Sequence, residues 1–139
     1  MKKVLFICTH NASRSQMAEG FLRALRGDRY EAFSAGTEPR GINPYAARVM
    51  TEAGVEIGGH RSKSVDEFQN SSFDEVITVC DSAREYCPVF FGGGSRRHQS
   101  FPDPSLLQGT EEEILAGFRS VRDAIRAWVV KEFCADSDL

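Results

Sequence analysis

The chain has 139 residues and a formal net charge of −3, with 41% hydrophobic and 27% charged residues. These values predict one soluble globular domain that spans residues 1–139. The negative charge argues against a nucleic-acid partner, because neutralising phosphates requires a basic surface. No run approaches the ~20 apolar residues that cross a bilayer, and the apolar stretch after residues 1–3 is too short for a signal peptide. We therefore expect a cytoplasmic protein without a membrane partner.

In the first half of the chain, short apolar runs alternate with helical patterns. Residues 3–7 are typical of a buried strand, and residues 16–26 repeat apolar side chains at helical spacing. A second strand is expected at 31–35. Asn43 and Pro44 are typical of a helix cap followed by the first helical position, which predicts a helix that ends near Ala53. A single helical turn is expected at 65–68.

The second half continues the alternation. Residues 74–79 predict a strand that ends at Cys80, and residues 98–101 predict a weaker fourth strand. The basic residues 96–98 are expected in a solvated loop. Thr110 and Glu113 predict a capping box that starts a helix ending near Phe133. The stripe of this helix that faces the core is expected to be Ile114, Phe118, Val121, Ile125 and Trp128.

The order of these elements predicts an α/β fold, with a four-stranded parallel sheet flanked by helices on both faces. In such sheets, ligands bind beyond the carboxyl ends of the strands. Cys8 and Cys80 each follow an expected strand. We therefore expect both cysteines at the ligand-binding edge.

The segment from Cys8 to Ser15 joins the first strand to the first helix and reads CTHNASRS. Backbone N–H groups in such a loop, together with the positive end of the helix dipole, can hold a tetrahedral oxyanion. Arg14 adds a planar fork of donors. The same positive field should lower the pKa of Cys8 from ~8.5 to about 6 and make it a nucleophilic thiolate. The expected oxyanion-binding residues are Thr9, His10, Asn11, Ala12, Ser13 and Arg14.

Several side chains near this loop have two interpretations. The Ser15 hydroxyl can donate to the Cys8 thiolate, or it can cap the helix. Asn11 tolerates the left-handed conformation and can hold the shape of the loop. His10 either contacts the substrate at the pocket rim or is exposed to solvent. Asp103, between two prolines, is either a general acid that protonates a leaving oxygen or an ordinary turn residue.

The chain has four cysteines. In a reducing compartment, cysteines are better interpreted as reactive or incidental thiols than as a framework of structural disulfides. Cys80 should lie near Cys8. Cys87 is seven residues further on, and in a helix its Cα atom would lie about 10 Å from that of Cys80. A disulfide needs less than ~7 Å, so a bond between them requires this segment to coil or unwind. The pair could instead be two buried small residues or half of a metal site. No second ligand pair has zinc-like spacing, so no metal is expected.

The chain closely resembles the thioredoxin-coupled arsenate reductases, which share the fold of the low-molecular-weight protein tyrosine phosphatases. The resemblance runs nearly end to end. Its most specific part is the pair Cys80 and Cys87 after a strand, which ordinary phosphatases of this fold lack. The other matching segments are the Cys-x5-Arg-Ser loop, residues 16–20 (QMAEG), 34–36 (SAG), 103–104 (DP) and 109–113 (GTEEE).

This resemblance implies a three-cysteine relay. The Cys8 thiolate attacks arsenate, which is held by the loop and Arg14, while Asp103 protonates the departing oxygen. Cys80 then attacks Cys8, arsenite leaves, and a Cys8–Cys80 disulfide forms. Cys87 attacks Cys80 and moves the disulfide to Cys80–Cys87, which thioredoxin reduces. No bound cofactor is implied, and phosphate and sulfate are expected to compete for the pocket.

The sequence departs from the family pattern in three places. His10 stands where the loop typically has glycine, and Ser13, or Ala12 beside it, stands where a further cysteine is common. Some members also bind potassium behind the loop, through residues that match Asn11, Glu19 and Ser34 and through an aspartate. Here Lys63 lies in the stretch that aligns with that aspartate. We expect the Lys63 ammonium to take the place of the cation against Glu19.

The main alternative is a low-molecular-weight phosphatase that hydrolyses phosphate monoesters through Cys8, Arg14 and Asp103. Tyr45 is the only aromatic candidate after residue 35 that could contact a phosphotyrosine ring, which disfavours this alternative. A non-catalytic oxyanion-binding or redox-sensing protein is a third alternative, disfavoured by the intact Arg14, Ser15 and Asp103. The expected reductant is thioredoxin, although another small thiol donor would fit. A monomer is expected.

Overall fold

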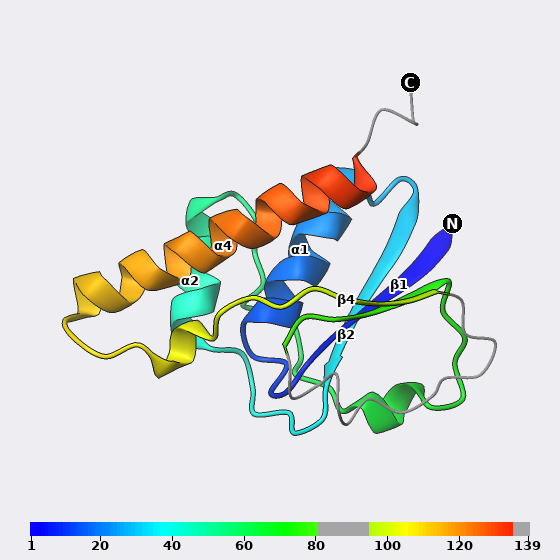
Figure 1. Cartoon of the computed structure of the whole chain (residues 1–139), viewed down its shortest axis with the longest axis horizontal. Helices are drawn as coiled ribbons and strands as arrows, with labels where there is room; N and C mark the ends of the chain where they lie inside the picture. The colour runs from blue at the N-terminus through cyan, green and yellow to red at the C-terminus, as the bar shows by residue number, and fades with distance from the viewer. Residues whose placement is uncertain (81–94, 135–139) are drawn as a thin grey trace.

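A computed structural model describes residues 1–80 and 95–134 of the chain (Figure 1). Its centre is one parallel sheet with the strand order β2-β1-β3-β4. The strands are β1 (Lys2–Cys8), β2 (Tyr30–Gly36), β3 (Glu75–Thr78) and β4 (Ser95–His98). In the register, Ile7 of β1 lies opposite both Ala35 and Thr78. The carboxyl ends of β1, β2 and β3 therefore meet at one edge of the sheet.

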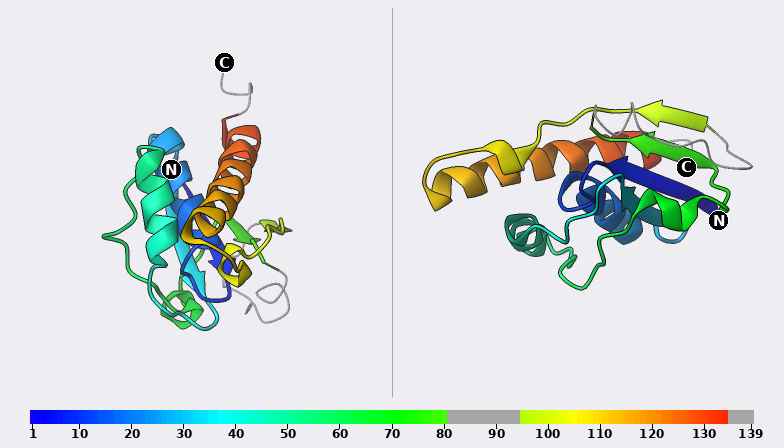
Figure 2. Two further views of the ribbon diagram at one scale, coloured as in Figure 1. Left: turned by 90° about the vertical axis from the view of Figure 1, so that its left-hand side faces the viewer. Right: turned by 90° about the horizontal axis from the view of Figure 1, so that it is seen from below.

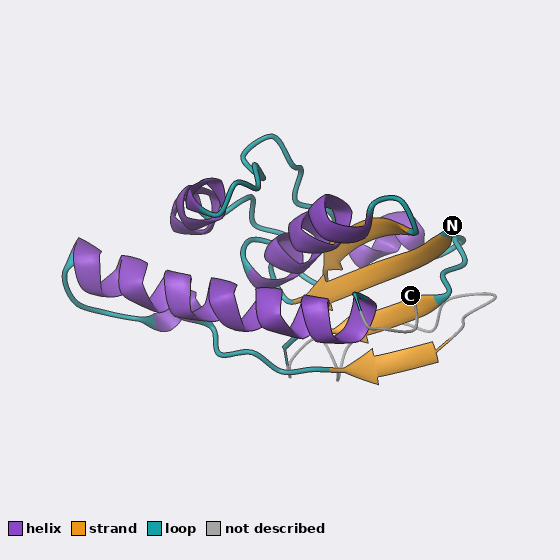
Figure 3. Cartoon of the chain, turned by 90° about the horizontal axis from the view of Figure 1, so that it is seen from above, coloured by secondary structure: helices purple, strands orange, loops and turns teal. Residues whose placement is uncertain are grey.

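The helices lie mainly on one side of this sheet (Figures 2 and 3). Helices α1 (Arg14–Arg26) and α4 (Glu111–Phe133) pack against each other, and α2 (Pro44–Glu52) packs against α4. The opposite face contacts the short 3-10 helix η1 (Val65–Phe68), since the ring of Phe33 lies 5.9 Å from that of Phe68. A second 3-10 helix, η2 (Pro104–Leu106), precedes α4. The predicted fold class, a four-stranded parallel sheet flanked by helices on both faces, is confirmed, with η1 on the second face.

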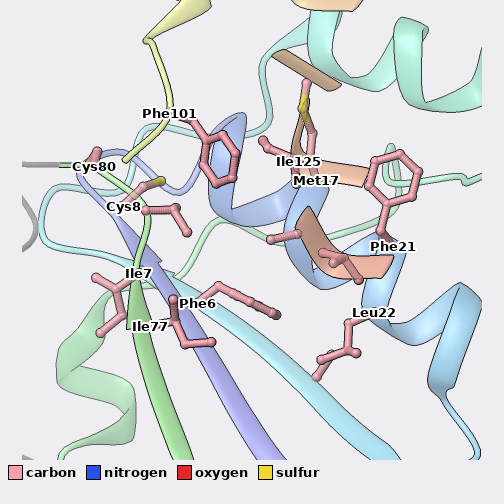
Figure 4. Close-up of a cluster of buried hydrophobic side chains, with 14 of the residues drawn as sticks. Phe6, Ile7, Cys8, Met17, Phe21, Leu22, Ile77, Cys80, Phe101 and Ile125 are labelled. Carbon is pink, nitrogen blue, oxygen red and sulfur yellow. The ribbon is translucent and has the colours of Figure 1, made fainter. Parts of the chain in front are cut away.

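The core is built around β1, which pairs with β2 on one side and with β3 on the other. Four successive β1 residues, Val4 to Ile7, are fully buried, which explains why this segment reads as a continuous apolar run (Figure 4). The Phe6 ring makes edge contacts with Trp128 at 6.0 Å and with Phe133 at 6.1 Å, so α4 packs directly over β1. Cys8 is thus the last residue of a buried strand.

The predicted position of the fourth strand is wrong. Residues 98–101 were expected to form it, and residues 96–98 were expected in a solvated loop, whereas β4 runs from Ser95 to His98. Arg97 forms ion pairs with Glu75 at 2.9 Å and with Glu132 at 2.6 Å. Partners from β3 and α4 therefore neutralise a charge that made this segment look like a loop.

Helix α4 begins where the sequence predicts, but the set of residues that it buries differs in part from the predicted stripe. The Thr110 side chain accepts a hydrogen bond from the Glu113 N–H at 3.2 Å, which completes the predicted capping box. Phe118, Val121 and Ile125 are buried as expected. Ile114 and Trp128 are only half-buried, and the buried positions also include Leu115, Val129 and Phe133. The helix therefore presents a broader face to the core than the five predicted residues describe.

We predict that the Phe6→Ala substitution lowers the free energy of unfolding by about 3–5 kcal/mol, because it removes a fully buried ring and leaves a cavity. Urea denaturation monitored by circular dichroism measures this change. The matched control is Leu25→Ala on α1, where the side chain is 36% exposed and the change should stay within about 0.5 kcal/mol. Equal effects of the two substitutions would contradict the central role of β1 in the core.

Candidate active site

The loop between β1 and α1 is held from outside by the chain segment that follows β2. The backbone N–H groups of Glu38, Arg40 and Asn43 donate to the carbonyls of residues 9, 10 and 12 at 2.7, 3.0 and 3.0 Å. Because these loop carbonyls bond outward, the loop is fixed with its N–H groups available to the pocket. The Asn11 N–H points at the Cys8 Sγ, 3.2 Å away.

Gly36 permits this close approach of the two segments. A Cβ atom on Gly36 would lie 2.7 Å from the carbonyl oxygen of Thr9 and 2.8 Å from the nitrogen of Asn11. Real Cβ atoms essentially never come so close to backbone atoms, so any larger residue would displace the loop. The glycine is therefore part of the architecture of the site.

Asn11 is the structural centre of the loop. It is the one non-glycine residue with positive φ in the part of the chain that the structure describes, with φ of 48°, and it is fully buried. Its Nδ2 donates to the Ser15 Oγ at 2.8 Å, and its Oδ1 accepts from the Lys63 N–H at 2.8 Å and from the Gln16 Nε2 at 2.9 Å. Asn11 thus links the loop, the first turn of α1 and the segment before η1.

Ser15 lies directly against the candidate nucleophile. Its Oγ is 2.8 Å from the Cys8 Sγ. Because the Ser15 oxygen already accepts from Asn11, its own proton is free to point at sulfur. The residue that caps α1 is Ser13, whose side chain makes no capping hydrogen bond. The geometry therefore favours the interpretation in which Ser15 acts on Cys8.

The predicted lowering of the Cys8 pKa is wrong for this structure. Burial raises the pKa of the Cys8 thiol, and nearby Cys80 acts in the same direction. The hydrogen bonds from Ser15 and the charge of Arg14 oppose this shift without reversing it. The cause is that Cys8 is only 2% exposed, and sequence alone does not reveal such burial.

Arg14 and Asp103 face each other at the pocket. The Arg14 Nη2 lies 3.5 Å from the Asp103 Oδ2, and its Nη1 donates to the Phe101 carbonyl at 3.1 Å. The other carboxylate oxygen of Asp103 accepts from the backbone N–H of Ser105 at 2.9 Å and from its hydroxyl at 2.6 Å. Asp103 therefore caps η2 and also lines the pocket, so its two interpretations are compatible.

Two adjoining cavities of about 400 Å³ each open at this edge. The first is lined by Cys8 and by Ala12, Ser13 and Asn43, and the second by Thr9 and Cys80. Both are lined by His10, Arg14, Asp103 and Leu106. His10 is half-buried and lies at the rim that the two cavities share.

Cys80 lies beside the nucleophile, two residues after β3 ends (Figure 4). It is 3% exposed, and its Sγ lies 3.3 Å from the Thr9 Oγ1 in the anion loop. The pairing of β1 with β3 produces this approach, as the sequence suggested. Cys8, Cys80 and Cys134 are free thiols, and Cys134 follows α4 away from the pocket. Cys87 lies outside the described residues.

Behind the loop, the nearly buried Glu19 carboxylate is surrounded by donors. It accepts from the Ser34 hydroxyl at 2.6 Å and pairs with Arg23 at 2.7 Å. The Lys63 Nζ lies 3.8 Å away, and His60 approaches to 3.6 Å. Burial lowers the pKa of the Lys63 ammonium, and the charge of Glu19 opposes that shift. The Lys63 ammonium therefore lies near Glu19, and its replacement of a cation stays a prediction.

Three residues of the site were missed by sequence reasoning. Gln16 links Asn11 to the Arg61 carbonyl, with its Nε2 at 2.9 and 3.2 Å from the two acceptors. Ser62 donates to the His10 carbonyl at 3.0 Å, and Arg40 lines the first cavity. Gln16 lies in a segment that matches the family, but its hydrogen bonds join distant parts of the chain, and for all three residues only the fold reveals these contacts.

Two negative findings concern the part of the chain that the structure describes. Residues 1–80 and 95–134 contain no group of three or more His, Cys, Asp or Glu side chains that could hold a metal ion. Within the same ranges, no helix is both long and apolar enough to cross a membrane.

Together, the fold and the loop define an α/β protein with a cysteine at the base of an oxyanion-binding loop. Over residues 3–135 the sequence matches the low molecular weight phosphotyrosine protein phosphatase family, and the chain belongs to this family.

Several proteins that are similar to this chain are named arsenate reductases. The chain is 42% identical over 124 residues to an arsenate reductase of Bacillus subtilis, covering 89% of each protein. A solved arsenate reductase in the phosphate binding state is 31% identical, with a TM-score of 0.75 over 93% of this chain and 94% of that one. A thioredoxin-dependent arsenate reductase of Corynebacterium glutamicum is 28% identical, with a TM-score of 0.62 over 92% of this chain and 60% of that one.

We predict that alkylation of Cys8 by iodoacetamide accelerates about tenfold per pH unit between pH 6 and pH 8, without a plateau in that range. Only the thiolate reacts, and burial raises the pKa above its ordinary value of ~8.5, so the reactive fraction keeps increasing with pH. Mass spectrometry of the Cys8 peptide measures the rate. Alkylation of Cys134 in the same sample is the internal control for the activity of the reagent.

The Ser15→Ala variant should shift this curve to higher pH, because it removes hydrogen bonds that lower the Cys8 pKa. A rate that is already constant near pH 6.5 would contradict the raised pKa. Equal curves for the wild type and the Ser15 variant would contradict donation from Ser15 to sulfur.

Proposed function

We propose that this protein reduces arsenate to arsenite through successive thiol exchange and is recycled by thioredoxin. The observation that carries the proposal is the position of Cys80, whose sulfur is held on the anion loop by Thr9, next to Cys8. Hydrolysis of a phosphate ester needs only one nucleophilic thiol, whereas reduction of arsenate needs two electrons, which two neighbouring thiols supply. The similarity to arsenate reductases supports the same conclusion.

In the first step, arsenate enters the cavity above Cys8. Loop N–H groups and the Arg14 guanidinium hold its oxygens, and the dianion accepts the thiol proton as sulfur attacks arsenic. Ser15 stabilises the developing negative charge on sulfur from 2.8 Å. Asp103 relays a proton to the departing hydroxyl oxygen, which leaves as water. A cysteine–arsenic bond has then formed without a change in the oxidation state of arsenic.

In the second step, the Cys80 thiolate attacks the sulfur of Cys8. The sulfur–arsenic bond breaks, and its electron pair leaves with arsenic, which is reduced from As(V) to As(III). The two sulfurs are oxidised to a Cys8–Cys80 disulfide, so the electrons balance. The contact between Cys80 and Thr9 keeps the attacking sulfur beside the loop throughout this step.

In the third step, Cys87 attacks Cys80, which releases Cys8 as a thiol and leaves a Cys80–Cys87 disulfide. Thioredoxin then reduces that disulfide. Support for this reductant comes from the thioredoxin-dependent relative and from the cysteine pattern of the sequence. Because the cycle starts from free thiols, we propose that the protein works in the reducing cytoplasm. We also propose that it works as a monomer.

A phosphatase is the second candidate, because the protein family and the set Cys8, Arg14 and Asp103 both fit hydrolysis of phosphate monoesters. In that case, Cys80 would have no role in turnover. Phosphate and sulfate, as tetrahedral oxyanions, are proposed to compete with arsenate for the same loop.

We predict that the wild type oxidises NADPH in the presence of arsenate, thioredoxin and thioredoxin reductase. The Cys8→Ser, Cys80→Ser and Cys87→Ser variants should each lose at least about 10³-fold in turnover, because each removes an obligatory sulfur. Cys134→Ser is the matched control and should retain full activity, since Cys134 lies at the far end of α4. Hydrolysis of a phosphate ester without arsenate-dependent turnover, together with an active Cys87→Ser variant, would establish the phosphatase instead.

We also propose that the Lys63 ammonium replaces a potassium ion behind the loop, since its Nζ lies 3.8 Å from Glu19, which also accepts from Ser34. Turnover should therefore be the same within about twofold in potassium and in tetramethylammonium salts at equal ionic strength. The Lys63→Ala variant should have lower turnover and gain a dependence on potassium. Clear stimulation of the wild type by potassium would contradict this role.

A further inference from the structure

The first cavity is lined by two arginines that come from different parts of the chain. Arg14 begins α1, and Arg40 lies in the segment that follows β2. The presence of Arg14 follows from the cysteine loop motif. Nothing in the relay described above uses Arg40, although its side chain lines the same cavity as the Cys8 thiol.

The backbone of Arg40 is fixed to the anion loop. Its N–H donates to the His10 carbonyl at 3.0 Å, within the set of hydrogen bonds that join residues 37–43 to the loop. The same carbonyl accepts from the Ser62 hydroxyl at 3.0 Å, which anchors this point from a third segment. The base of the Arg40 side chain therefore keeps a constant position relative to Cys8.

The two guanidinium groups differ in their existing partners. Arg14 already donates to the Phe101 carbonyl at 3.1 Å and lies 3.5 Å from the Asp103 carboxylate. Arg40 is exposed, and among residues 1–80 and 95–134 its side chain makes no hydrogen bond or ion pair. An anion can engage Arg40 without breaking any interaction inside the protein.

The charges of the residues that line the cavity also indicate a role for Arg40. Arg14 and Asp103 contribute opposite charges and largely cancel at a distance. Among the Asp, Glu, Lys and Arg side chains that line this cavity, Arg40 is the one that remains. A positive charge at the mouth attracts dianions more strongly than monoanions or neutral molecules.

We propose that Arg40 is a second oxyanion-binding guanidinium, which selects small doubly charged oxyanions at the mouth of the cavity. It binds the oxygens that face away from the loop, while Arg14 and the loop N–H groups bind those that face inward. This inference rests on the proposed function in taking arsenate as the substrate. It assigns to Arg40 the binding of substrate rather than the chemistry on sulfur.

The test uses inorganic phosphate as the probe, because it needs no turnover. Reduced protein is treated with iodoacetamide at pH 8 with increasing phosphate, and alkylation of the Cys8 peptide is measured by mass spectrometry. The reagent is neutral, so Arg40 does not affect its approach. Arg40→Gln should raise the phosphate concentration that half-protects Cys8 about tenfold, and Arg40→Lys about threefold, because lysine keeps the charge without the planar fork.

The matched control is Arg48→Gln on α2, which removes the same charge from an exposed arginine that does not line the cavity. Its half-protecting concentration should equal that of the wild type. In turnover, Arg40→Gln should raise KM for arsenate by the same tenfold factor and leave kcat unchanged, since the interaction contributes to binding alone. Added sodium chloride should reduce the difference between Arg40→Gln and the wild type.

Equal protection of the wild type and Arg40→Gln within twofold would overturn the assignment, and so would a failure of phosphate to protect wild-type Cys8. Both results concern binding only. Phosphate protection that depends on Arg40, in a protein that does not reduce arsenate, would uphold this inference and refute the proposed function. Arsenate reduction that is unchanged in Arg40→Gln would uphold the proposed function and refute this inference.

Discussion

The geometry of the site depends on the buried side chain of Asn11. Its left-handed backbone directs the loop N–H at sulfur, and its amide group bonds to Ser15 on α1 and to the backbone of Lys63. Because Asn11 is fully buried, each of these hydrogen bonds would be costly to leave unmade. Aspartate would lose the donor to Ser15, and alanine would lose all of the side-chain bonds. One amide therefore holds the nucleophile, its hydroxyl partner and the backbone of the loop in register.

The site combines a buried thiol with strong local charge. Burial raises the pKa of Cys8, so the thiol is protected in the free protein and becomes reactive when its proton can move to an arriving dianion. Behind the loop, Glu19 is balanced by the cations of Arg23 and Lys63. This second cluster stabilises the back of the loop. Its own cations balance Glu19, so the guanidinium groups of Arg14 and Arg40 remain available to an anion in the pocket.

Much of the fold could be predicted from the sequence, because its signals are local. The apolar run before Cys8, the cap at Asn43 and the capping box at Thr110 each depend on residues within a few positions of one another. β4 was misplaced because Arg97 is neutralised by Glu75 and Glu132, which are distant in sequence.

The features of the site likewise fall into two groups, those that the sequence predicts and those that only the folded structure reveals. The loop residues follow from a motif, and the approach of Cys80 to Cys8 follows from the alternation of strands and helices. The direction of the Cys8 pKa shift and the presence of Arg40 at the pocket depend on how completely the chain closes around the loop. Burial and long-range packing determine these features, and neither is encoded in a short pattern.

The charged strand β4 has a further consequence for the protein in a crowded cell. It lies at one end of the described sheet, where a strand exposes unpaired backbone groups that can recruit a strand from another molecule. The exposed Arg96 places a positive charge along that edge, whereas the charge of Arg97 is neutralised by Glu75 and Glu132. A second copy that approached edge to edge would bring like charges together. The positive charge on this edge strand thus opposes edge-to-edge pairing between two copies of the folded protein.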